Sequence, residues 1–161
     1  MGSYAEALKQ FYDGEVFGET IYSALCEAAS DPVERRKWAT LLQLETETKA
    51  WMRPHLVAHG VGVEEHGDAV RRRALETVRP FLGRPWGEQV RWIADVFEQR
   101  VVPAVQALVD EAEARSDEKA TAVCRYYLEH ERIQGVFAQR ELAGDGETSL
   151  ELVTPFLKYP I

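Results

Sequence analysis

The feature that most constrains this chain is the spacing of its apolar residues, which recur every three or four positions through four long segments. This spacing is the period of an α-helix with one apolar face, whereas a half-buried strand alternates every second residue, and no segment does so. The sequence therefore predicts an all-α fold. We expect helices at about residues 4–29, 32–59, 86–114 and 117–143.

The boundaries of these helices carry typical start signals. Ser30-Asp31-Pro32 offers an N-cap followed by proline at the first helical position, and Ser116-Asp117 precedes the fourth helix. Pro103 lies inside the third helix, where its ring leaves the carbonyl of Gln99 without its usual helical partner. We therefore expect a kink close to Glu98.

The connections between the helices predict how the chain is organised. Residues 61–85 form a long crossover, in which glycines and prolines bracket Arg71-Arg72-Arg73, and we expect a shorter helix there. Two helical hairpins joined by a crossover favour a four-helix bundle, and 161 residues with 45% hydrophobic side chains suit one domain over residues 1–161. The tail, 145–161, is expected to pack four side chains across one end of the bundle: Leu150, Leu152, Phe156 and Leu157.

The charge and hydropathy pattern argues against several classes of protein. A net charge of -8 without an acidic tail argues against nucleic acid or an anionic membrane surface as a partner. No apolar run has the roughly 18 residues of a spanning helix, and the N-terminus does not resemble a secretory signal, so we expect a cytoplasmic location. Cys26 and Cys124 lack the spacing of a zinc or redox site and are expected to be reduced core residues.

The unusual feature is a set of glutamates on the inward stripe, by which we mean the helical positions otherwise occupied by Leu, Tyr, Trp, Val or Phe. An unpaired buried carboxylate destabilises a fold by several kcal/mol, so protons, cationic side chains or metal ions have to compensate these groups. The glutamates on the inward stripe are Glu15, Glu19, Glu45, Glu98 and Glu131.

Three segments carry a family resemblance: Phe17-Gly18-Glu19-Thr20-Ile21-Tyr22, Leu44-Glu45-Thr46-Glu47-Thr48 and His130-Glu131-Arg132-Ile133-Gln134. Over roughly residues 10–142, the chain resembles the ferritin-like superfamily, in particular rubrerythrin-like and di-iron carboxylate proteins. That family places a glutamate on two helices and Glu-x-x-His on the other two. The resemblance implies a ferritin-like bundle with a metal site inside it.

The resemblance also implies roles for individual residues. Glu19 and Glu98 would be terminal ligands, and Glu45 and Glu131 would bridge two metal ions. Glu15, one turn before Glu19, is a further oxygen donor on the same helical face. Tyr22 follows the first ligand as it does in the family.

This chain departs from the family at both histidine positions, which hold Thr48 and Gln134. Neither is a strong ligand for iron. His130 is expected about 100 degrees around the helix from the neighbouring stripe residue Glu131. An oxygen-only donor set favours manganese, magnesium or calcium over zinc, while ferrous iron stays compatible with carboxylates. The expected cofactor is iron or manganese, or none.

Two functions are consistent with this pattern. The first is an oxidoreductase, a metal-dependent oxidase or oxygenase that acts on a small molecule with oxygen or peroxide, in which Thr48, Gln134 and Tyr22 line the site. The second is a metal-free bundle whose degenerate site binds a small molecule or a protein partner. A homodimer through helix faces is compatible with either.

Two simpler explanations stay open. The stripe glutamates can be protonated by burial, or can pair with arginines near the bundle surface, for which Arg53, Arg91, Arg125 and Arg132 are suitably spaced. His55 and His59, four residues apart at the end of the second helix, can bind a metal ion or interact with the negative end of the helix dipole.

Overall fold

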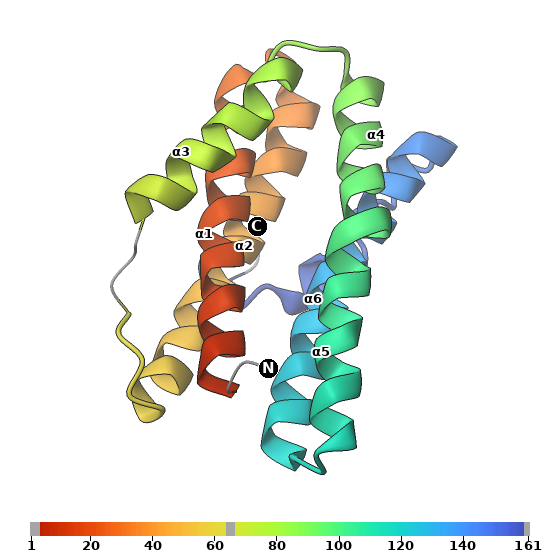
Figure 1. Ribbon diagram of the computed structural model, residues 1–161. Coiled ribbons are helices and arrows are strands. Elements are labelled where there is room, and N and C mark those ends of the chain that lie inside the picture. The colour runs from red at the N-terminus through yellow and green to blue at the C-terminus, as the bar shows by residue number, and fades with distance from the viewer. Residues whose placement is uncertain (1–3, 64–66, 160–161) are drawn as a thin grey trace. The chain divides into compact units, whose positions relative to one another are not determined.

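The computed structural model describes residues 4–63 and 67–159, and all regular secondary structure in these two ranges is helical (Figure 1). The predicted all-α class is therefore confirmed. None of the described helices is long and apolar enough to cross a membrane. The chain divides into two compact units, residues 1–84 with 157–161 and residues 85–156.

The first unit is a helical hairpin with a third helix on one side. Helices α1 (Tyr4–Ala28) and α2 (Pro32–Ala58) run antiparallel, and α3 (Gly67–Val78) packs on α1 before the 3₁₀ turn η1 (Arg79–Phe81) (Figure 1). The short helix predicted in the crossover is thus confirmed as α3. Residues 64–66 of that crossover lie outside the described residues.

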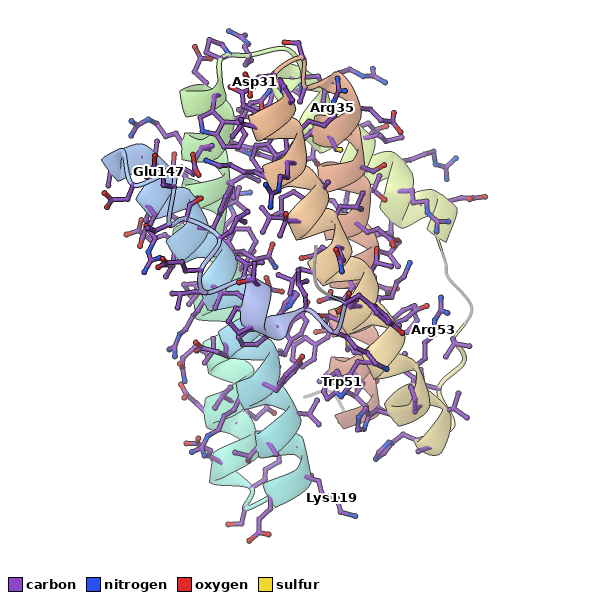
Figure 2. The ribbon with its side chains drawn as sticks, turned by 180° about the vertical axis from the view of Figure 1, so that it is seen from behind. Asp31, Arg35, Trp51, Arg53, Lys119 and Glu147 are labelled. Atoms are coloured by element: carbon purple, nitrogen blue, oxygen red, sulfur yellow. The ribbon has the colours of Figure 1, made fainter. Side chains whose placement is uncertain are left out.

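The turn between α1 and α2 forms as its sequence predicts. Asp31 is the N-cap of α2, and its carboxylate accepts hydrogen bonds from the backbone N–H groups of Val33 and Glu34 at 2.8 and 3.0 Å. The Arg35 guanidinium donates to the Ala29 carbonyl at 2.6 Å. Figure 2 shows Asp31 and Arg35 at this end of the hairpin, with Trp51 and Arg53 towards the other end of α2.

The second unit pairs one long, interrupted helix with α6. Helix α4 (Trp86–Val96) continues through the π-helical segment η2 (Phe97–Val101) into α5 (Val102–Ala114), and α6 (Glu118–Ala143) packs against all three segments. The backbone N–H of Val102 donates to the Phe97 carbonyl, five residues back. A kink was predicted from Pro103 close to Glu98; the structure has a turn of π-helix there, which includes Glu98.

The residues after α6 differ from the prediction. Among the four side chains expected to pack, Leu152 is 41% exposed, whereas Val153 is completely buried. The chain forms hydrogen-bonded turns here, in which the N–H groups of Val153 and Thr154 both donate to the Leu150 carbonyl. This turn directs Val153 inward instead of its neighbour. A short 3₁₀ turn, η3 (Thr154–Phe156), follows, and residues 160–161 lie outside the described residues.

Candidate functional site

A close approach between α1 and α2 places the Glu45 carboxylate against Gly18. A Cβ atom added to Gly18 would lie 2.2 Å from Oε2 of Glu45 and 2.7 Å from its Cδ. Real Cβ atoms do not come this close to their neighbours, so only glycine leaves room for the carboxylate in this position. The close approach of Glu45 therefore explains why residue 18, in the segment Gly18-Glu19, is a glycine.

Glu15 and Glu45 form a buried carboxylate pair on the α1–α2 hairpin. Their side chains are 0% and 3% exposed, and one oxygen of Glu15 lies within 4.8 Å of one oxygen of Glu45. Two negative charges at this separation repel each other strongly where water is excluded, unless a proton or a cation lies with them. The structure thus brings two of the predicted ligands together.

Glu19 has a different environment from this pair. Its Oε2 accepts a hydrogen bond from the Lys49 ammonium at 2.5 Å, and its Oε1 accepts one from the Thr46 hydroxyl at 2.7 Å. Lys49 is buried, with 7% exposure. The compensation expected for this carboxylate therefore comes from a lysine of α2, which was not among the arginines predicted as partners.

Three of those arginines donate hydrogen bonds to groups other than the stripe glutamates, and Arg53 does so to the Tyr12 hydroxyl at 3.3 Å. Arg125 donates to Glu113 of α5 at 2.7 Å, and Arg132 donates to the side-chain carbonyl of Gln106 at 2.9 Å. Both contacts lie on the exposed surface of the second unit, where a charge pair contributes little.

Thr48 and Tyr22 are both buried in the first unit, but their surroundings differ. Thr48 is 3% exposed and lies three residues after Glu45, on the same side of α2. Tyr22 stacks on Trp38 of α2, with ring centroids 5.9 Å apart and an interplanar angle of 21°. Packing therefore accounts for the ring of Tyr22, and its catalytic role stays a prediction.

Glu98 does not lie on the buried face of its helix. The prediction that it faces inward is wrong, because its side chain is exposed. It belongs to the π-helical segment η2, where the extra residue in the turn shifts the following positions around the helix axis relative to a regular α-helix. Pro103 was the sequence feature that predicted an irregular backbone here, but it did not predict that Glu98 would be exposed.

The buried polar side chains of α6 are Glu131, Gln134 and His130, with 7%, 0% and 0% exposure. Nε2 of Gln134 lies 3.1 Å from Nε2 of His130, and the ring of Tyr127 stacks on the imidazole at a centroid distance of 5.5 Å. If the amide NH₂ donates, the imidazole nitrogen is the acceptor and carries no proton. Glu131 and Gln134 are buried as predicted.

His130 was missed as an inward residue. Its spacing was the available signal, because it lies three residues after Tyr127 and four before Gln134, which puts all three on one side of a helix. The buried face of α6 is wider than one stripe and includes both His130 and its neighbour Glu131. An imidazole is the nitrogen donor type that the Thr48 and Gln134 positions lack.

His59 and the two cysteines have surroundings that the structure describes. Nδ1 of His59, the C-cap of α2, lies 2.8 Å from the His55 carbonyl, so this ring caps the end of the helix. The Cys26 thiol donates to the Arg35 carbonyl at 3.6 Å. Burial, and to a lesser extent the charge of Asp117, raises the pKa of the Cys124 thiol. Both cysteines are free thiols.

Comparisons with known protein families, with curated proteins and with solved structures found no match.

Proposed function

We propose that this chain is a ferritin-like metal–carboxylate protein, an oxidoreductase that acts on a small molecule with oxygen or peroxide. The observation that carries the proposal is the buried pair Glu15 and Glu45, with carboxylate oxygens within 4.8 Å of each other. A bound cation compensates both charges at once.

The donor chemistry of the pair fits a hard divalent ion. Carboxylate oxygens bind such ions at about 2.0–2.6 Å, so two oxygens on one ion are at most about 4–5 Å apart. The separation of Glu15 and Glu45 is compatible with that limit after small side-chain movements. Gly18 supports the same site, because it lets the Glu45 carboxylate approach α1. Manganese and ferrous iron are the metals we propose.

The roles of the other predicted ligands change in this proposal. Glu19 supports the site from outside, since its two oxygens accept hydrogen bonds from Lys49 and Thr46. Glu98 is left out of the ligand set because it is exposed. Glu131, on the second unit, stays a ligand predicted from the sequence alone. Thr48 and Gln134 are proposed to hold water or substrate through their hydroxyl and amide groups, and the metal when bound supplies the oxygen or peroxide chemistry.

The ferritin-like arrangement is part of the proposal. It is supported by the wiring of two helical hairpins through a long connection, which is how such bundles are built. Small-angle X-ray scattering tests it, because a compact chain of this length has a radius of gyration of about 15 Å. A markedly larger value would show that the two units do not pair as one bundle in solution.

Elemental analysis of untagged protein, produced with manganese and iron in the medium, tests the metal site. We expect bound metal in the parent protein, its loss in the double variant Glu15→Gln/Glu45→Gln, and its retention in the control Glu98→Gln. Peroxide consumption by the metal-loaded protein should be lost with the metal. Protein that holds neither metal would refute the proposal.

A second candidate function is a metal-free bundle that binds a small molecule or a protein partner. The observation that favours it is the buried Lys49, which already supplies one positive charge beside Glu19. In that case Glu15→Gln/Glu45→Gln keeps or increases the thermal stability, because neutral amides remove the repulsion between two buried carboxylates. In a metal protein, the same change removes the stabilisation that the ion provides.

A further inference from the structure

The first unit contains a groove that neither of the two functions above assigns. It lies between α1, α2 and α3 and has a volume of about 490 Å³. Residues of one side of α1 line it, together with Leu42 and Thr46 of α2 and Arg71 and Leu75 of α3. Its volume falls within the range of small-molecule sites.

The α3 wall of this groove is held in place by packing. Ala74 and Val78 of α3 are completely buried. The guanidinium of Arg73 lies 5.3 Å from the ring centroid of Phe17 on α1, which is a cation–π contact. The helix that carries Arg71 and Leu75 is therefore fixed against α1, and the groove is preformed in the first unit.

The charges along the groove are balanced. Two carboxylates line it, Glu19 and Glu27, and Arg71 supplies one positive charge. The Lys49 ammonium lies on the Glu19 carboxylate at 2.5 Å and neutralises it. The remaining carboxylate and the guanidinium have opposite signs, so the groove does not select a simple cation or a simple anion.

The rest of the lining is part apolar and part hydroxyl. Ala24, Leu42 and Leu75 provide apolar surface, and Ser23 provides a hydroxyl group next to it. These lining groups match a ligand that has a short hydrocarbon chain with a polar group at each end. We propose that this groove binds a small zwitterionic molecule, with its amine on Glu27, its acid group on Arg71 and its hydrocarbon part on the apolar surface between them.

This site is separate from the buried pair Glu15 and Glu45, neither of which lines the groove. The proposal therefore does not depend on a metal. If the metal proposal fails, binding in the groove is unaffected, and if groove binding fails, the metal site is unaffected.

Titration followed by amide NMR spectra of the full-length, metal-free protein tests the groove. The probes are ε-aminocaproate, which carries both charges, and its two monofunctional analogues, hexylamine and caproate. We expect ε-aminocaproate to bind at least about tenfold more tightly than either analogue, because each charged hydrogen bond contributes independently. Shifts should concentrate on the groove-lining segments of α1, α2 and α3.

Two variants assign the contacts. Glu27→Gln and Arg71→Gln should each lower the affinity for ε-aminocaproate by about tenfold. The neighbouring exposed controls, Glu76→Gln and Arg72→Gln, should leave it unchanged. Glu27→Gln should lower hexylamine binding without changing caproate binding, and Arg71→Gln should do the reverse. The proposal is overturned if no probe binds, if an analogue binds as tightly as ε-aminocaproate, or if both groove variants bind like the parent protein.

Discussion

The carboxylate of Glu45 occupies the space in which a side chain at residue 18 would lie, with Oε2 only 2.2 Å from the Cβ position of Gly18. Gly18→Ala therefore forces the Glu45 carboxylate out of this buried position. We expect the free energy of unfolding to fall by about 1–3 kcal/mol, measured by urea denaturation. The affinity for a metal ion at Glu15 and Glu45 should fall in the same variant.

Two further variants separate this clash from a general effect of alanine. Glu45→Asp shortens the side chain by one methylene, so the double variant Gly18→Ala/Glu45→Asp should recover part of the lost stability. Gly87 of α4 has no heavy atom within 4 Å of its Cβ position. Gly87→Ala should then be neutral or stabilise by up to about 1 kcal/mol. Equal losses for the alanines at positions 18 and 87 would contradict the predicted clash.

The Lys49–Glu19 ion pair should contribute to stability more than an exposed pair. Its lysine and glutamate side chains are 9% and 22% exposed, whereas those of Arg125 and Glu113 are 65% and 42% exposed. A double-mutant cycle with Lys49→Met and Glu19→Gln should give a coupling energy of about 1–2 kcal/mol. The cycle for Arg125 and Glu113 should give less than about 1 kcal/mol. Equal couplings would show that burial does not strengthen the first pair.

The Asp31 N-cap should be visible in the stability of the protein. Its carboxylate accepts two backbone N–H groups at the start of α2. Asp31→Ala is expected to lower the free energy of unfolding by about 1 kcal/mol, while Asp31→Asn, which retains a capping oxygen, should lose much less. Urea denaturation of both variants measures the difference. An asparagine that is as harmful as alanine would assign the effect to the lost charge.

Cys124 should react more slowly with alkylating reagents than Cys26. Burial raises its pKa, so the reactive thiolate is scarce at neutral pH, and the side chain is 2% exposed. Half-buried Cys26 should react first with iodoacetamide, and Cys124 only after unfolding. Peptide mass spectrometry locates the modification. Rapid alkylation of Cys124 in the folded protein would contradict its burial.

The same raised pKa predicts how stability depends on pH. The folded protein holds the Cys124 proton more tightly than the unfolded chain does. This contribution to stability is complete below the ordinary thiol pKa of 9.0 and is lost as the pH rises from there towards the raised value. As the pH rises above about 9, the free energy of unfolding of Cys124→Ala should therefore fall less than that of the parent protein. Urea denaturation across that pH range measures the difference.

The helices were largely predictable from local signals. The period of three and four, the caps at Asp31 and Asp117 and the Pro103 irregularity act within one turn of chain, so their physical causes are written in adjacent residues. The burial of Glu15, Glu45 and Glu131 was also predicted, because these glutamates replace apolar residues on an apolar stripe.

The candidate site was less predictable, because burial depends on the neighbouring helix. Glu98 lies on the predicted stripe yet is exposed, in the π-helical segment η2. His130 lies beside the stripe yet is completely buried, since the covered face of α6 is wider than one stripe.

By itself, the sequence determined that this protein is helical, where its helices begin and end, and that carboxylates lie among its buried side chains. Only the tertiary structure decided which charges meet: Lys49 beside Glu19, and Glu45 against Gly18 and near Glu15. The physical reason is the sequence separation over which each interaction acts. Helix formation depends on neighbours within about four residues, whereas a charge pair depends on the approach of residues about 30 positions apart on two helices.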